Sequence, residues 1–196
     1  MHDVLERTPR RESRRRPAAA SIAAILCFLA AMLAFANPAG ARESGLLDLT
    51  CTPPSSASVT YTPPLTNAPQ TASSNLHWEL GPCVSLSRPD ITAGTHTVQN
   101  PPRQRSCLEL LASGAVTRTI TWNTGETSTL SMNRTTTVVG AALIVTHTGT
   151  VTSGVFAGDT VVVTEAGPAA AILTCTLGLG SVSSVYNVLT MEITSL

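Results

Sequence analysis

Most of the chain beyond residue 45 alternates apolar and polar residues with a period of two, and this pattern limits the folds open to it. The alternating segments are rich in Thr and Val, whose β-branched side chains favour strands. Clusters of Gly, Pro and Asn separate them, and no long stretch has apolar residues at helical spacing. The sequence therefore predicts an all-β domain of about nine or ten antiparallel strands, each with one buried face.

Regularly spaced turn residues place the expected strands. These segments are 46–50, 58–62, 76–80, 118–122, 127–132, 136–148, 150–156, 160–165, 170–177 and 185–193, with 95–99 as an optional short strand. The clearest hairpin joins 118–122 to 127–132 through a turn in which Gly125 can take a positive φ. Gly140 is expected to bend the strand 136–148, and Gly149 to form a turn. Residues 107–112 fit either a strand or one helical turn. Because no crossover helix is expected, we predict an antiparallel immunoglobulin-like β-sandwich with two disulfides.

Residues 10–41 have the three-part layout of a secretory signal peptide. Five arginines precede an apolar run of 19 residues from Ala18 to Ala36, and Ala39-Gly40-Ala41 provides a small-residue cleavage site. We expect cleavage after Ala41, so that 1–41 is a helical signal peptide and 42–196 is a single secreted or cell-envelope domain. The alternatives are cleavage after Ala36 and retention of the apolar run as a membrane anchor.

Removal of residues 1–41 changes the charge of the chain. The remainder has six Arg against nine Asp or Glu, a net charge of −3, so it has no basic surface for nucleic acid. Lysine is absent from the whole sequence, which excludes P-loop and Schiff-base lysine chemistry. Membrane contact is expected only through the signal peptide before its cleavage.

Four cysteines follow the signal peptide, and in an exported protein they are expected to form disulfides. We favour Cys51–Cys175, which would tie the opening strand to a late one, and Cys83–Cys107, which would close the irregular segment 84–106. Successive cysteines are 32, 24 and 68 residues apart, unlike the close pairs of a zinc site. No metal is expected.

Few side chains of residues 42–196 are candidates for catalysis. The histidines of residues 42–196 are His77, His96 and His147, and only His96 has a nearby acid in the irregular region, Asp90. No GxSxG, HExxH or calcium-loop motif occurs. We therefore expect no enzyme activity, no catalytic residue and no cofactor.

The remaining charged and aromatic residues are interpreted structurally. Trp78 and Trp122 alternate with Leu80 and Ile120, which predicts burial. The scattered glutamates do not form an obvious facing pair and are interpreted as solvated surface charge: Glu79, Glu109, Glu126, Glu165 and Glu192.

Several short motifs occur in a fixed order along the chain. They are Cys51, Gly81-x-Cys83, the segment Thr119 to Thr129, the segment Thr148 to Phe156 with Gly158-Asp159, and Cys175. In this order the chain resembles uncharacterised small secreted β-sandwich proteins of high-GC Gram-positive bacteria. The resemblance covers most of residues 46–193. It implies a secreted β-sandwich with disulfides, and it supplies no catalytic residues.

These observations predict a non-enzymatic binding or structural module at the cell envelope or in the medium. Its partner would be an unknown protein or envelope component. Loops on such sandwiches usually carry recognition, and the irregular segment 87–105 is the candidate, with Arg88, Asp90, Arg103 and Arg105 as binding residues. Two alternatives remain. One is a small secreted hydrolase that uses His96 or paired carboxylates. The other is a protease inhibitor presenting the 84–106 loop, preorganised by its bridge and prolines.

Overall fold

The computed structural model describes residues 46–195, which form one antiparallel sheet and two short helices. The strands are β1 (Leu47–Cys51), β2 (Ser56–Leu65), β3 (Gln70–Leu80), β4 (Cys83–Ser85), β5 (Gly94–Arg105), β6 (Gly114–Trp122), β7 (Thr127–Val139), β8 (Ala142–Gly154), β9 (Thr160–Pro168) and β10 (Val182–Thr194). The helices are η1 (Cys107–Leu111), of 3₁₀ type, and α2 (Ala170–Thr176).

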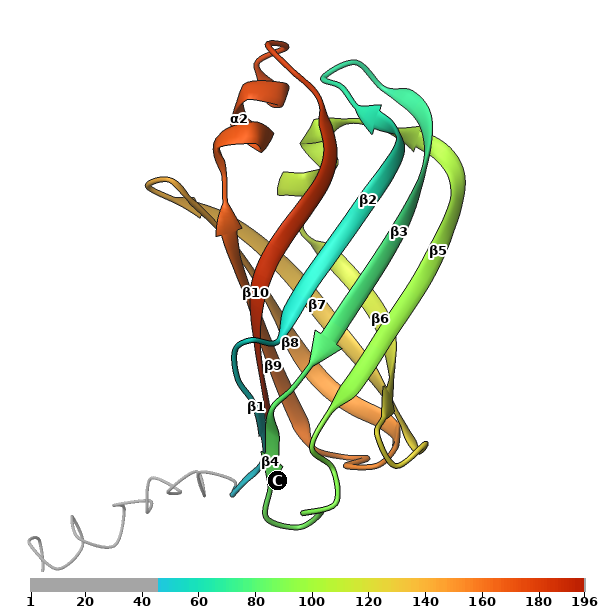
Figure 1. The fold of residues 1–196 in the computed structure, drawn as a ribbon, viewed down its shortest axis with the longest axis vertical. Coiled ribbons are helices and arrows are strands. Elements are labelled where there is room, and N and C mark those ends of the chain that lie inside the picture. The colour runs from blue at the N-terminus through green and yellow to red at the C-terminus, as the bar shows by residue number, and fades with distance from the viewer. Residues whose placement is uncertain (1–45, 196) are drawn as a thin grey trace, which may run out of the picture. The chain divides into compact units, whose positions relative to one another are not determined.

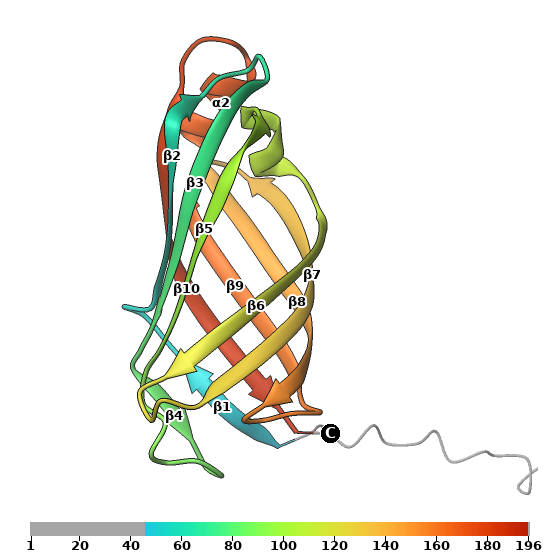
Figure 2. The ribbon, with the colours of Figure 1, turned by 90° about the vertical axis from the view of Figure 1, so that its right-hand side faces the viewer.

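The sheet closes on itself into an eight-stranded barrel (Figures 1 and 2). Its order is β2-β3-β5-β6-β7-β8-β9-β10, and β10 pairs back onto β2. We call the end that holds β1 and β4 the lower end and the end that holds α2 the upper end (Figure 1). The antiparallel β architecture with two disulfides is confirmed, but a single closed sheet replaces the two stacked layers of the expected immunoglobulin-like sandwich.

Strand β10 makes the closure possible because it is 13 residues long. Its upper part, from Val182 to Val188, pairs with β2, and its lower part, from Met191 to Thr194, pairs with β1. Strand β4 pairs in turn with β1 and extends the sheet outside the barrel. Closure gives both long edges of the sheet a partner, which removes unpaired backbone groups.

Two glycines take roles different from those expected. Gly140, with φ +59°, lies in the tight turn between β7 and β8, so the expected long strand 136–148 is a hairpin. Gly149 lies inside β8, where a Cβ atom would be 2.0 Å from the carbonyl oxygen of Ser131 on β7. The glycine there permits close approach of two backbones rather than a turn. The hairpin through Gly125, with φ +84°, is confirmed.

The segment 170–177, expected as a strand, is mostly the helix α2. Pro168 ends β9, and the following Ala170 and Ala171 are strong helix formers. Ile172 and Cys175, one turn apart, bury the same side of α2 in the upper end of the barrel. At 107–112 the structure has the helical turn η1, one of the two expected alternatives.

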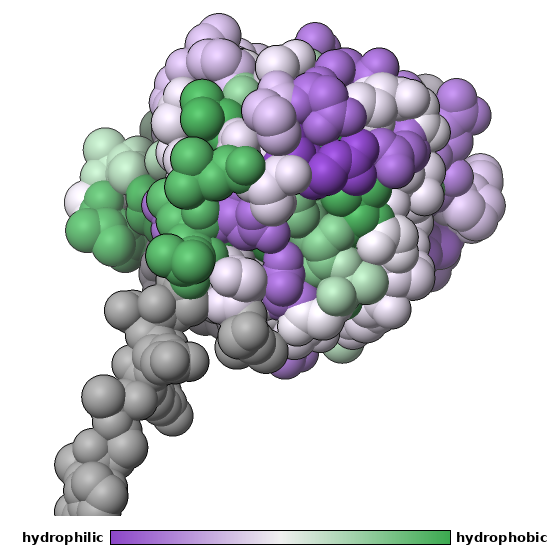
Figure 3. Space-filling view, turned by 90° about the horizontal axis from the view of Figure 1, so that it is seen from below, coloured by the Kyte–Doolittle hydropathy of each residue, from purple (hydrophilic) through white to green (hydrophobic). Residues whose placement is uncertain are grey.

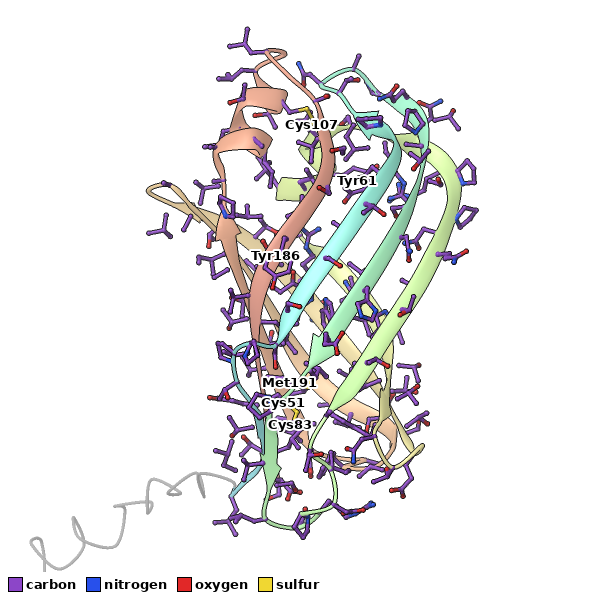
Figure 4. All side chains as sticks on the ribbon, in the orientation of Figure 1. Cys51, Tyr61, Cys83, Cys107, Tyr186 and Met191 are labelled. Carbon is purple, nitrogen blue, oxygen red and sulfur yellow. A yellow bond between two sulfur atoms is a disulfide. The ribbon has the colours of Figure 1, made fainter. Side chains whose placement is uncertain are left out.

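All four cysteines are oxidised, but the predicted pairing is wrong. The bridges are Cys51–Cys83, between the paired strands β1 and β4, and Cys107–Cys175, between η1 and α2. Figure 4 shows them at opposite ends of the barrel. The prediction failed because it placed Cys175 in a strand beside β1, whereas its helix lies at the upper end beside η1.

The two disulfides indicate an oxidising, extracytoplasmic location. The predicted signal peptide and its cleavage site lie outside the described residues. Among residues 46–195, no helix has the length and hydropathy needed to span a bilayer.

Apolar side chains inside the barrel form two separate clusters. The lower cluster is the larger and includes Trp78, Trp122, Leu130, Leu189 and Met191. The upper cluster lies beneath the two helices and joins Leu65, Leu110, Leu143, Ile172 and Val182. The burial predicted for both tryptophans is confirmed.

Some apolar side chains remain on the outside of the lower end. Leu46, Leu47, Val84 and Leu86 are exposed on or beside β1 and β4. Seen from below, hydrophobic side chains gather along one side of this end (Figure 3).

Candidate functional site

A cavity of about 470 Å³ occupies the upper half of the barrel interior. It opens between β5 and β6, which pair only where Gly94 and Thr95 meet Trp122 and Thr121. Above that point the two strands separate, and η1 connects them across the upper end (Figure 2). Residues from both strands line the opening, among them Asn100 and Arg103 on β5 and the segment 114–116 on β6.

Five consecutive strands each contribute one polar side chain to the wall of this cavity. We call this set the polar layer: Arg118 on β6, Arg134 on β7, His147 on β8, Glu165 on β9 and Asn187 on β10. Each lies at an inward position, because side chains of one strand face the same side at every second residue.

Three members of the polar layer form a buried hydrogen-bonded chain. His147 donates from Nε2 to Oε1 of Glu165 at 3.0 Å, and Asn187 donates from Nδ2 to Oε2 of the same carboxylate at 3.0 Å. All three side chains are buried. Burial by itself would raise the pKa of Glu165, but these two hydrogen bonds and the attraction of His147 and Arg118 outweigh it and lower the pKa. Glu165 is therefore an anion at neutral pH.

Arg118 lies with its guanidinium carbon 4.5 Å from the centroid of the Trp78 ring, a cation–π contact. Its Nη1 is 3.4 Å from Nε2 of His96. His96 donates from Nδ1 to the carbonyl oxygen of Thr119 at 2.9 Å, so its Nε2 is left to accept. Burial lowers the pKa of His96 and keeps this ring neutral. Burial also lowers the pKa of Arg118 to about 10, although Glu165 partly counteracts it.

Arg134 connects the polar layer to the helix above it. Its guanidinium donates to the carbonyl oxygens of Glu109 and Leu110, at 3.4 and 2.8 Å. At the rim, Arg103 makes two parallel bonds to the Glu109 carboxylate at 2.9 and 3.0 Å, and Arg105 approaches the same group at 3.5 Å. These contacts hold η1 beside the opening.

The cavity wall has more positive than negative charge, because four arginines and two glutamates line it. Within residues 46–195, four buried side-chain nitrogen or oxygen atoms have no hydrogen-bond partner, and three of them belong to the polar layer: Nε of Arg118, Nδ1 of His147 and Oδ1 of Asn187. These atoms have almost no accessible surface, so they lie behind the cavity wall rather than on it. The groups that a ligand can reach are the more exposed arginine side chains of the wall, Arg103, Arg118 and Arg134.

The rest of the wall is largely aliphatic. Its apolar side chains come from β2, β3, β6, β8, β10 and η1: Val59, Leu76, Leu110, Val116, Leu143, Val145 and Val185. Tyr61 adds a phenol whose pKa burial raises to about 12, so it is neutral at physiological pH. The cavity is thus amphipathic, with aliphatic side chains between the polar layer and a charged rim.

The four residues expected in one binding loop do not come together. Residues 94–105 are the strand β5, which runs from the lower to the upper end of the barrel. Arg88 and Asp90 lie before it and pair with each other at 2.9 Å, and Arg88 also contacts Glu126. Arg103 and Arg105 lie at its far end, on the cavity wall. The sequence predicts a loop here because Pro101 and Pro102 interrupt the period-two pattern and cannot donate hydrogen bonds to a neighbouring strand.

The groups behind the two alternative functions are also separated. The hydrogen bonds of His96 go to Thr119 and Arg118, and those of the Asp90 carboxylate go to Arg88. Cys83 pairs with Cys51, so no bridge closes the 84–106 segment as the inhibitor hypothesis assumed. The expectation that Glu165 is a solvated surface charge is wrong, because its side chain is buried.

Sequence reasoning missed His147 and Glu165 as site residues, although the sequence contains a signal for them. Glu165 is in phase with the buried Val161 and Val163, and His147 is in phase with the buried Val145 and Val151. A polar residue on the apolar face of an alternating strand indicates an interior polar site. Among residues 46–195, no group of three or more His, Cys, Asp or Glu could hold a metal ion.

The chain matches no protein-family model, no curated protein is significantly similar to it in sequence, and no solved structure is significantly similar to it in fold.

Proposed function

We propose that this protein is an extracytoplasmic binding module that holds a small organic molecule inside its barrel. The observation that carries the proposal is the amphipathic cavity, which is lined by four arginines and two glutamates together with aliphatic side chains. A hydrogen bond to a charged group contributes about 1.5–3 kcal/mol, so a molecule that pairs with these arginines is stabilised in the cavity.

The size and construction of the cavity support this function. Its volume of about 470 Å³ lies within the range of roughly 300–1,000 Å³ of small-molecule sites. Such sites combine an apolar wall with a few polar groups that fix the orientation of the ligand. The polar layer lies on rigid strands rather than on loops, which keeps its groups in position without a ligand.

The proposal is tested by thermal unfolding of the secreted protein with a panel of small acids, bases and neutral compounds. Native mass spectrometry of protein purified from its own culture medium adds a second readout. Val116→Trp places a large side chain in the opening, and Val162→Trp places one on the exposed outer face of β9 as a control. We expect ligand-induced stabilisation in the wild type and in Val162→Trp, and its loss in Val116→Trp. No stabilisation by any compound would contradict the proposal.

One observation favours a small secreted hydrolase as a second candidate. His147 is oriented by the Glu165 carboxylate through Nε2, and its buried Nδ1 has no partner, so it would act as a general base only on a water molecule that reaches this inaccessible atom. A panel of ester and glycoside substrates, assayed before and after His147→Gln, tests this candidate. Turnover lost in the variant while ligand binding persists would support it, and no turnover by the wild type would exclude it for those substrates.

A further inference from the structure

We propose that the molecule bound in the barrel is an organic monoanion, with a carboxylate held at Arg118 and a compact aliphatic body against the apolar side chains above it. This inference rests on the proposed binding function and names its ligand class. It follows from the charges of the polar layer, from the partners of the Arg118 guanidinium, and from the aliphatic side chains that lie one inward position above the polar layer on β6, β8 and β10.

The two arginines of the polar layer face only one carboxylate. Arg118 contacts the Trp78 ring and the neutral His96, and Arg134 donates to two backbone carbonyls. Neither guanidinium has a carboxylate as a hydrogen-bond partner among residues 46–195. The polar layer contains one carboxylate, Glu165, whose two oxygens accept from His147 and Asn187. The two arginines and the one glutamate together have a net charge of +1.

The excess positive charge of these groups is costly inside the barrel. A buried cation that lacks a counter-ion loses hydration without regaining it, which disfavours its charged form. The pKa of Arg118, lowered to about 10 by burial, shows this effect, and the group is still protonated at neutral pH. One bound negative charge would balance the two arginines and the glutamate. A second would be repelled by Glu165, so a monoanion fits better than a dianion.

The Arg118 guanidinium and the aliphatic side chains near it match the two ends of such a ligand. Arg118 lines the cavity and is only partly buried, and its Nη2 makes no hydrogen bond to residues 46–195, whereas Nη1 contacts His96 and Nε is inaccessible. A guanidinium presents parallel N–H groups that match the two oxygens of a carboxylate, which favours this headgroup over an alcohol or an amine. The aliphatic side chains of Val59, Leu76, Val116 and Val185 line the same cavity and suit a hydrocarbon body.

Isothermal titration of the secreted protein with four matched probes tests the inference. The probes are octanoate, octan-1-ol, octylamine and octyl phosphate, which share one body and differ in headgroup charge. A hydrogen bond to a charged group contributes enough that octanoate should bind about tenfold to a hundredfold more tightly than octan-1-ol. Octyl phosphate should bind more weakly than octanoate, and octylamine more weakly than octan-1-ol.

Three variants locate the headgroup. Arg118→Gln should weaken octanoate binding by about tenfold or more and leave octan-1-ol binding unchanged. Glu165→Gln removes the negative charge, while its amide oxygen can still accept from His147 and its NH2 can donate to Oδ1 of Asn187 once the Asn187 amide turns over, and it should tighten octanoate binding. Arg88→Gln, at the lower end of the barrel, is the matched control and should change neither affinity. If Arg118→Gln does not fold, tighter octanoate binding by Glu165→Gln supports the inference, and unchanged or weaker binding overturns it.

The outcomes separate this inference from the proposed function. Equal affinity for octanoate and octan-1-ol, tighter binding of octyl phosphate, or unchanged octanoate affinity in Arg118→Gln would overturn the monoanion assignment and leave a binding cavity of another preference. No binding of any of the four probes would overturn the inference. Failure of the broader compound panel and of native mass spectrometry as well would overturn the proposed function.

Discussion

The lower and upper halves of the barrel interior are built on the same strands but have different contents. In the lower half the inward positions hold apolar side chains such as Leu130, Met132, Leu189 and Met191, which pack into a solid core. One or two inward positions higher, the same strands place Arg134 and Asn187 on a cavity. The alternation of a strand decides which side chains face inward, and their chemistry decides whether the interior is a core or a site.

The largest expected difference between the halves is in stability. Trp122→Ala removes a buried ring that packs on Gly94 and Phe156 and donates to Ser128, and should lower the free energy of unfolding by about 3–5 kcal/mol. Leu76→Ala, on the cavity wall, should cost only about 1 kcal/mol because its side chain already borders open space. Urea unfolding measures both. Equal losses would show that the upper half is packed as tightly as the lower.

The two disulfides brace the two ends, and their removal should have comparable effects on stability. The bridge Cys51–Cys83 spans 32 residues and Cys107–Cys175 spans 68, and replacing either pair by serines should cost about 2–4 kcal/mol. Only loss of Cys107–Cys175 should also speed hydrogen exchange in η1 and weaken ligand binding, because it frees the helices over the cavity. Weaker ligand binding after loss of Cys51–Cys83, with unchanged binding after loss of Cys107–Cys175, would contradict the division of the barrel into a core and a site.

Acidification should affect the interior carboxylate more than the surface ones. The pKa of Glu165 is lowered in the folded state, so its stabilising contribution is present above its ordinary value of 4.5 and is lost as the pH falls below it. Glu165→Gln should therefore flatten the loss of unfolding free energy between about pH 6 and about pH 3. Glu126→Gln removes an exposed carboxylate whose pKa the hydrogen bond from Arg88 lowers, and its smaller effect should fade in high salt. Identical profiles for the two variants would contradict the burial argument.

The smallest effect is expected at the rim of the cavity. Arg103→Gln breaks the two bonds to Glu109, but the side chain is largely exposed, so the unfolding free energy should change by less than about 1 kcal/mol. The change should shrink further at high salt. A loss as large as that of a core substitution would show that the rim, and not only the disulfide and Arg134, holds η1 in place.

Local sequence patterns predicted much of the secondary structure. The hairpin around Gly125 is present because a residue that tolerates positive φ lies between two alternating segments. The burial of Trp78 and Trp122 follows from their phase with Leu80 and Ile120. The helix α2 was missed because a seven-residue segment is too short to show a helical period, and its helix is stabilised by packing on the barrel end.

The candidate site was only partly visible in the sequence. Arg103 and Arg105 were named, but for a loop that does not exist, and they lie on the wall of the cavity instead. His147 and Glu165 are 18 residues apart and meet because β8 and β9 pair in one register. Their inward phase was readable, but their contact depends on that register.

The sequence alone determined that this protein is an antiparallel β domain with four oxidisable cysteines and apolar strand faces, because these properties depend on residues close together in the chain. Tertiary structure decided between a sandwich and a barrel, chose the cysteine partners, and assembled the polar layer. Alternating strands fit either architecture equally well, and only the pairing of β10 with β2, across more than a hundred residues, closes the sheet and creates an interior.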